Sequence, residues 1–379
     1  MRLVQAIFNA LILADDSFVA LVARQLTDLY YSTSRQQIPK YAEWWPRLLD
    51  AIEKDDRTVE IPSQLHAKAI NTACGRLTQA AIDDVERSLR AHESVENELI
   101  NNLGRAARMP QAQGIYARAV LVYSTKFIVK INAASVIDAL TSALNQDNAE
   151  AAALRSILAS ASEITPSASK IFRTQILRGV LEVGVDRTGT MVAAANIIRP
   201  ALSILRNDHD ASNWGISLND TAFHLRSGPS SLRDGAALLL KNWLSDIDGG
   251  PARTWLECIR PLLDKVWPRE RTLNGAGQAM SFAEMAINSN EAFPDALQFL
   301  MPYMSPSNSA VNSYQLGQSK APENFPRQTL ALLWKLFGSR SRSQLYEIDK
   351  ILDRIVKADP EIEFDRRLQW LNQRAVRFE

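Results

Sequence analysis

An Asp-His-Asp triplet, Asp208-His209-Asp210, lies within "RNDHDASNW" at 206–214 and has the side chains best suited to chemistry. Imidazole and carboxylate groups ligate transition metals and act as general acids and bases. A second imidazole, His224, follows in the same region. Helical proteins can build metal or carboxylate sites in their interior without a local motif. These four residues are therefore the candidate site of an enzymatic alternative.

The same triplet also suits a joint between two helices. Asp, Asn and Ser side chains bond to nearby backbone groups and favour loops. Neighbouring loop residues point apart, so Asp208 and Asp210 would not both reach one ion together with His209. We expect one of the two aspartates to close a helix, and Ser212 or Asn213 to open the next. This interpretation is favoured, and it predicts no metal, no catalytic residue and no cofactor.

The common catalytic motifs are missing from the sequence. It contains no Gly-x-x-x-x-Gly-Lys-Ser/Thr, no His-Glu-x-x-His and no Gly-x-Ser-x-Gly. The glycines of "NGAGQAMS" at 274–281 do not complete a dinucleotide fingerprint. We therefore expect a protein that is not an enzyme.

The last segment, "EFDRRLQWLNQRAVRFE" at 363–379, has the period of one helix. Its expected core stripe is Phe364, Leu368, Leu371, Ala375 and Phe378, and a second face carries Arg366, Trp370, Arg374 and Arg377. Arginine forms forked bonds to carboxylate or phosphate, and tryptophan supplies flat apolar area, so this face could bind a protein or nucleic acid. The favoured alternative is that the tryptophan packs on a neighbouring helix and the arginine stems cover its ring.

Composition narrows the class of protein. Lys and Arg number 43 and Asp and Glu number 42 in 379 residues, a balance that argues against a protein dedicated to coating nucleic acid. Cys74 and Cys258 lie far apart in sequence and do not have the spacing of a metal-binding motif. We expect both to be buried thiols in a reducing cytoplasm. The apolar run at 3–14 is too short to span a membrane and has helical spacing. We predict a cytoplasmic protein with no membrane contact.

Helices are expected over most of the chain, and they must position the residues named above. "LYEIDKILDRIVKA" places Leu345, Ile348, Leu352 and Ile355 on one amphipathic stripe. Alternating strand patterns are nearly absent. The predicted fold is all-α, an irregular α-solenoid of stacked antiparallel helix pairs that is HEAT-like. "NIIRPALSIL" at 196–205 and "ECIRPLLDKV" at 257–266 share Ile-Arg-Pro-x-Leu, either as divergent repeats or by coincidence.

Polar and proline-rich joints predict four segments. They are an N-terminal helical region at 1–107, a central helical-repeat region at 108–304, a Pro/Ser/Asn-rich linker at 305–326 and a C-terminal helical unit at 327–379.

The closing segment "ALLWKLFGSRSRSQLYEIDKILDRIVKADPEIEFDRRLQWLNQRAVRFE", 331–379, resembles the C-terminal helical-repeat regions of large bacterial anti-phage defence proteins. In these proteins a sirtuin-type effector precedes long helical repeats. The resemblance implies a sensor or scaffold part with a protein partner. It does not carry over the effector's activity, because no sirtuin-type Gly-rich segment or catalytic His motif is present in the sequence.

Overall fold

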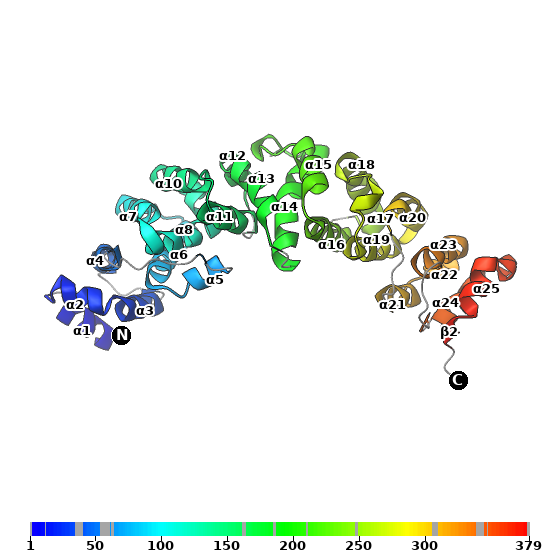
Figure 1. The fold of residues 1–379 in the computed structure, drawn as a ribbon, viewed down its shortest axis with the longest axis horizontal. Helices are drawn as coiled ribbons and strands as arrows, with labels where there is room; N and C mark the ends of the chain where they lie inside the picture. Colours follow the sequence, from blue (N-terminus) through cyan, green and yellow to red (C-terminus); the bar gives the residue numbers. More distant parts are fainter. Residues whose placement is uncertain are drawn as a thin grey trace. The chain divides into compact units, whose positions relative to one another are not determined.

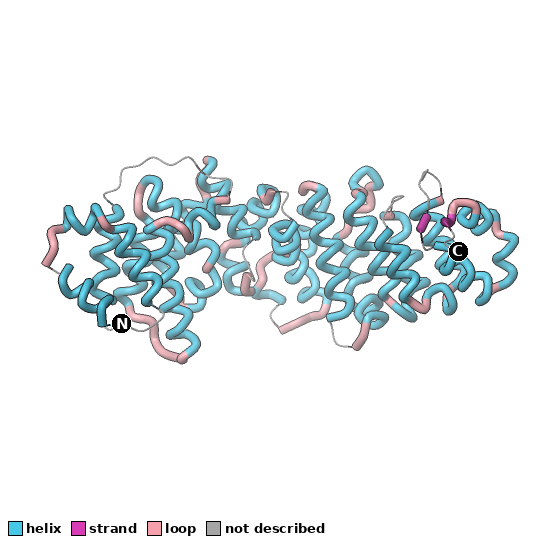
Figure 2. The backbone as a smooth tube through the Cα atoms, turned by 90° about the horizontal axis from the view of Figure 1, so that it is seen from below, coloured by secondary structure: helices cyan, strands magenta, loops and turns pink. Residues whose placement is uncertain are grey.

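In the computed structural model the chain is almost entirely helical (Figures 1 and 2). The structure describes residues 2–11, 13–34, 41–53, 61, 64–160, 164–184, 187–209, 211–246, 249–304, 310–338, 345–346 and 348–376. Within these ranges the strands are two residues long each, β1 (Leu345–Tyr346) and β2 (Ala375–Val376). The predicted all-α class is confirmed.

The helices form two compact units, Met1–Gly184 and Val185–Glu379, called unit 1 and unit 2 below. The division falls where the backbone becomes extended at Val183, after the last helix of unit 1. It differs from the boundaries that the polar joints suggested, because helices on either side of 107/108 pack against each other. A joint rich in polar residues therefore need not separate domains.

Unit 1 stacks its helices in chain order (Figure 1). One layer holds α3 (Ala23–Ser34), α6 (Ala73–Arg90), α8 (Gln111–Tyr123), α11 (Ala149–Ser160) and α13 (Arg173–Glu182). The second layer holds α4 (Tyr41–Glu53), α7 (Asn97–Arg108) and α10 (Ala134–Leu144). Shorter helices complete the unit: α1 (Arg2–Leu11), α2 (Asp16–Leu21), α5 (Leu65–Ala69), α9 (Thr125–Lys130) and α12 (Pro166–Ile171). Each helix buries its apolar stripe against the next pair, as stacked helix pairs require.

Unit 2 also has two layers. One holds α14 (Arg187–Leu205), α16 (Ser230–Asp246), α19 (Ala276–Asn288), α21 (Ala310–Gln318) and α24 (Ile348–Ala358). The other holds α15 (Leu218–Ser227), α17 (Pro251–Thr254), the π-helical turn η2 (Trp255–Ile259), α18 (Arg260–Val266), α20 (Phe293–Leu300), α23 (Pro326–Phe337) and α25 (Arg366–Asn372). α22 (Ala321–Asn324) and the short 3₁₀ turns η1 (Ala211–Asn213), η3 (Arg271–Leu273), η4 (Asn290–Ala292), η5 (Met301–Tyr303) and η6 (Pro360–Phe364) join them.

Buried and half-buried arginines join successive helix pairs by hydrogen bonds. In unit 1, Nη1 of Arg118 on α8 donates to the carbonyls of Ala107 and Met109, at 3.1 and 2.9 Å. Nη1 of Arg155 on α11 donates to the carbonyls of Leu144 and Gln146, at 2.8 and 2.9 Å. For each arginine, the two carbonyls lie eleven and nine residues earlier in the chain, at the end of the preceding helix. Each therefore satisfies carbonyls that a helix end leaves unpaired.

A related tie occurs in unit 2. Nη1 of Arg233 on α16 donates to the carbonyls of Leu225 and Gly228, at 2.9 and 2.8 Å, and its Nε donates to Leu273 at 3.1 Å. Arg233 reaches carbonyls eight and five residues earlier, a different spacing from that of Arg118 and Arg155. The divergent-repeat and HEAT-like interpretations stay predictions.

Among the residues that the structure describes, one helix, α14, is long and apolar enough to cross a membrane, over Thr188–Leu205 with mean hydropathy 1.2. However, 56% of that window is buried inside the protein, and α14 packs along α16. The packing is that of a core helix.

The predicted linker at 305–326 differs from the structure wherever it is described. Residues 310–318 and 321–324 form α21 and α22, which pack on α24. Pro322 lies in the first turn of α22, where a missing N–H costs nothing, and Leu316 of α21 is fully buried. Pro322, which suggested a linker, instead lies at the start of a short helix.

The predicted single helix at the C-terminus is also corrected. Asp365 caps α25 by accepting a hydrogen bond from the Arg367 N–H at 2.8 Å, so the preceding Phe364 lies outside the helix and is 81% exposed. After α25, Ala375 and Val376 pair in parallel with Leu345 and Tyr346. Leu368 and Leu371 are buried as expected, and Phe378 lies outside the described residues.

Candidate functional site

The Asp-His-Asp stretch forms a helix joint, although with other capping residues than expected. Asn207 closes α14 in the left-handed conformation, with φ 53°. The N–H of Asp208 donates to Ser203 at 3.0 Å, and that of Asn207 donates to Ile204 at 3.2 Å, which is a Schellman closure. Asp208 and His209 are exposed, and Asp208 lies 3.7 Å from Arg206. Asp210 lies outside the described residues.

The next helix, α15, is opened by Ser217 and not by Ser212 or Asn213. The Ser217 hydroxyl accepts from the Asp220 N–H at 3.1 Å, and the Asp220 carboxylate accepts from the Ser217 N–H at 2.8 Å. This reciprocal capping box satisfies two backbone donors at once. Ser212 and Asn213 form the 3₁₀ turn that leads to it.

His224 is buried on α15. Its Nδ1 lies 2.7 Å from the carbonyl oxygen of Asp220, and a carbonyl only accepts, so this nitrogen carries the proton. Among the described residues, no three His, Cys, Asp or Glu side chains converge in a group that could hold a metal ion. The structure therefore does not bring Asp208, His209 and His224 together as a metal site.

The C-terminal arginine face is largely occupied by contacts within the protein. Trp370 packs edge-to-face on Trp334 of α23, with ring centroids 5.4 Å apart. The guanidinium of Arg374 lies 3.8 Å from the Trp370 ring centroid. Arg366 is exposed, and Arg377 lies outside the described residues. Trp370 thus packs on a neighbouring helix, as the favoured alternative predicted.

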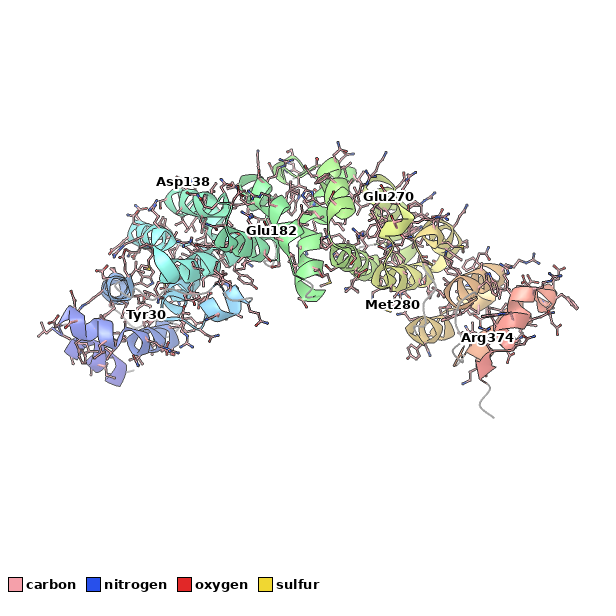
Figure 3. All side chains as sticks on the ribbon, in the orientation of Figure 1. Tyr30, Asp138, Glu182, Glu270, Met280 and Arg374 are labelled. Carbon is pink, nitrogen blue, oxygen red and sulfur yellow. The ribbon has the colours of Figure 1, made fainter. Side chains whose placement is uncertain are left out.

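A pocket that the sequence did not reveal lies in unit 2, between α18, the loop that follows it and α20 with η5. We call it the Arg260 pocket. Its volume is about 520 Å³, within the range of ligand sites. It is lined by Arg260, Asp264, Arg269, Arg271, Asp295, Gln298, Phe299, Pro302 and Tyr303. Glu270 and Met280, labelled in Figure 3, mark the pocket's loop and α19 in the other layer.

A π-helical turn sets the position of Arg260. Its N–H donates to the carbonyl of Trp255, five residues earlier, which widens the helix. The next residue, Pro261, has no N–H, and its ring would clash with a carbonyl four residues back in a regular α-helix. Isolated π turns of this kind occur frequently at functional sites. The turn places Trp255 in the core and Arg260 at the surface.

Aromatic rings form the floor of the Arg260 pocket. The rings of Phe299 and Tyr303 lie 6.2 Å apart and are half-buried. Behind them, Phe299 packs on Trp255 at 5.9 Å and Tyr303 packs on Phe282 at 6.1 Å. These separations are those of favourable aromatic pairs, so the floor is a rigid apolar surface.

Ion pairs form the wall of the Arg260 pocket. Nη1 of Arg260 lies 2.9 Å from Oδ2 of Asp295, whose Oδ1 accepts a hydrogen bond from the Trp255 indole at 2.7 Å. Nη2 of Arg269 donates to Oδ1 of Asp264 at 2.9 Å. Arg271 forms no ion pair with any described residue. The wall therefore presents three guanidinium groups, and two of them are paired with a carboxylate.

The ionisation of Tyr303 follows from its place in the floor. Burial raises the pKa of its phenol, while nearby Arg269 lowers it and Asp264 raises it. The phenol is consequently protonated at neutral pH and can donate a hydrogen bond to an anionic group. Guanidinium groups, a phenol donor and an apolar floor can together bind an anion that carries an apolar side group.

Sequence reasoning missed the Arg260 pocket although part of its signal was visible. "ECIRPLLDKVWPRERTL" at 257–273 has three arginines beside Trp267, and its Ile-Arg-Pro was noted only as a repeat. The rest of the lining follows later in the chain, in a different helix and turn, and includes Asp295, Phe299 and Tyr303. Only the tertiary packing brings the two halves together.

The arrangement defines an all-α protein built from stacked helix pairs, with a charged and aromatic pocket in unit 2. Over its sequence the chain is 25% identical to the uncharacterized protein y4cA of Sinorhizobium fredii (strain NBRC 101917 / NGR234). The alignment covers 99% of this chain and 32% of that protein, so the chain spans about a third of its relative's length. No protein-family model and no solved structure matches the chain.

Proposed function

We propose that the chain is a non-enzymatic helical-repeat module that binds a protein partner. The observation that carries this proposal is the Arg260 pocket, whose arginines and half-buried aromatic rings lie at the surface of unit 2. Arginine and aromatic residues are the types enriched at the centres of protein interfaces. The ordered π turn and ion pairs hold them in place before a partner arrives, which lowers the entropy lost on binding.

The hydrogen bonds from three arginines to the ends of preceding helices support a scaffold role. Arg118, Arg155 and Arg233 each bond the end of one helix from the helix that follows it. Stacked helix pairs joined in this way present long, fixed surfaces to other proteins. These hydrogen bonds therefore favour a scaffold that binds a partner over an enzyme that closes around its substrate.

We further propose that this module is the sensor or scaffold part of a bacterial defence system. The support is the resemblance of 331–379 to the helical regions of anti-phage proteins. The greater length of the Sinorhizobium fredii relative is compatible with a module that works beside other domains. Localisation in the cytoplasm belongs to the same proposal.

Affinity capture of the full chain from its native host tests the binding role. We expect one protein at equal stoichiometry, which, once purified, binds the purified chain again in analytical ultracentrifugation. Recovery of nucleic acid that salt removes would instead favour the alternative in which Arg366 and its neighbours bind phosphate. Recovery of neither would contradict the proposal and leave the enzymatic alternative around Asp208 and His209 to be tested by metal analysis.

A further inference from the structure

We infer that the Arg260 pocket binds an acidic segment of a partner protein, in which a carboxylate lies beside an aromatic or aliphatic side chain. This inference rests on the proposed function and specifies the chemistry of the partner. It concerns only unit 2, because all the residues of the pocket belong to that unit.

The positive groups of the pocket are arranged to receive carboxylate. Arg271 is exposed and forms no ion pair with any described residue. Arg260 and Arg269 use only part of their donor set on Asp295 and Asp264. A guanidinium has five N–H donors, so each can bind a second carboxylate in forked geometry. Their side chains are 46% and 72% exposed, which leaves these donors accessible to a partner.

The aromatic floor of the Arg260 pocket indicates which kind of partner side chain should lie beside that carboxylate. Phe299 and Tyr303 are half-buried and present their rings beside the arginines. An aromatic or aliphatic side chain of the partner would cover these rings and remove apolar surface from water. A volume of about 520 Å³ accommodates a few side chains and not an extended polymer.

The charge pattern favours an acidic peptide over nucleic acid. Affinity for a phosphate backbone grows with the number of phosphates that Lys and Arg neutralise, because each releases counterions. In the lining, Asp264 and Asp295 alternate with the arginines and pair with Arg269 and Arg260, and nearby Glu270 pairs with Arg226 of α15. A continuous phosphate backbone would meet these carboxylates, whereas single carboxylates of a peptide can contact the arginines between them.

The test uses the full chain and a random dodecapeptide phage library. We expect selected peptides to be enriched in Asp or Glu next to Phe, Tyr, Trp or Leu. The affinity of a synthetic enriched peptide should fall by about tenfold or more in Arg271→Glu, because a charge that contacts the ligand is reversed. Arg271 is exposed and unpaired among the described residues, so its replacement should leave the fold intact.

Arg24→Glu is the matched control. Arg24 is also exposed and forms no ion pair with any described residue, but it lies on α3 in unit 1. Its replacement should change the affinity less than twofold, roughly the scatter between mutants that do not touch a site. Thermal unfolding of both variants should match that of the wild-type chain.

Three results would overturn the inference. They are peptides enriched in Lys and Arg or without a charge bias, equal losses of affinity in Arg271→Glu and Arg24→Glu, or a labelled 20-nucleotide single strand whose binding depends on Arg271. The proposed function fails separately, if affinity capture from the host recovers no protein partner. A host partner that still binds Arg271→Glu with wild-type affinity would contradict only the role given to the pocket.

Discussion

Arg155 and Glu182 meet edge to edge in unit 1. Nε of Arg155 lies 2.8 Å from Oε2 of Glu182, and Nη2 lies 2.6 Å from Oε1. The remaining Nη1 donates to the carbonyls of Leu144 and Gln146. One side chain thus joins the end of α10, the helix α11 and the end of α13. The Arg155 side chain is only 3% exposed and its bond to Leu144 is buried, whereas its bonds to Gln146 and Glu182 are part-buried.

Replacement of Arg155 by Ala should therefore be costly. It leaves the buried Leu144 carbonyl and the part-buried Gln146 carbonyl without their donor, while the Glu182 carboxylate can turn to water, so the free energy of local unfolding should fall by about 1–3 kcal/mol. Hydrogen exchange read by mass spectrometry over 134–182 would report the change. Arg178→Ala is the control, because the Arg178–Asp147 pair lies at the surface with Asp147 85% exposed. Equal effects of the two variants would contradict the role given to Arg155.

The close approach of α11 and α13 predicts a steric effect at Gly179. A Cβ at this position would lie 2.2 Å from the carbonyl oxygen of Arg155, which is a backbone atom and cannot move aside cheaply. Gly179→Ala should lower the free energy of unfolding by about 1–3 kcal/mol, the usual cost of overpacking. Gly317→Ala on α21 should do the reverse. A Cβ there meets nothing within 4 Å, and Ala gains about 0.5–1 kcal/mol over Gly in a helix.

Thermal unfolding of the two glycine variants against wild type checks this prediction. The melting temperature should fall for Gly179→Ala and stay equal or rise for Gly317→Ala. A Gly179→Ala protein with an unchanged melting temperature would mean that the two helices separate easily.

The helices could be predicted because their signals are local. The stripe Ile348, Leu352 and Ile355 is buried as its spacing indicated. Leu345 was placed on the same stripe, but it pairs with Ala375 in a two-residue strand. That pairing joins residues far apart in sequence, so helical periodicity could not reveal it. The joint at 206–214 agrees with its polar composition, but its capping residues are Asn207 and Ser217, which polar composition alone does not single out among several Asp, Asn and Ser residues.

The Arg260 pocket depends on packing between elements. Arg260 and Asp295 approach each other only after α18 and α20 have folded into one layer. The widened turn that aims Arg260 follows from Pro261, but a proline after an arginine does not by itself indicate a π turn. Buried arginines such as Arg155 were equally hidden, because arginine is normally assigned to the surface.

The thiol of Cys74 should be chemically silent in the folded protein. Burial raises its pKa to about 12, because the thiolate would lose its solvation. Only thiolate reacts readily, so at pH 8 Cys74 should not react with an aromatic disulfide reagent. The measurement uses a Cys258→Ala variant, in which Cys74 is the remaining thiol. One equivalent should react after unfolding in guanidinium, and rapid reaction before unfolding would contradict its burial.

His66 should make the protein less stable in mild acid. The imidazole stacks on Tyr123, with ring centroids 4.0 Å apart, and burial lowers its pKa from the ordinary 6.5. The unfolded chain therefore binds the proton more readily than the folded chain, and stability rises with pH through this range. The contribution of neutral His66 is fully present above pH 6.5 and is lost as the pH falls below it.

A His66→Phe variant isolates this effect, because it keeps an aromatic ring on Tyr123 and removes the titration. Between pH 7.5 and pH 5.5 the melting temperature of the wild-type chain should fall more than that of His66→Phe. The two proteins differ only at residue 66, so the comparison isolates this side chain. Parallel pH profiles would show that His66 gains a proton as easily in the folded chain as in the unfolded one.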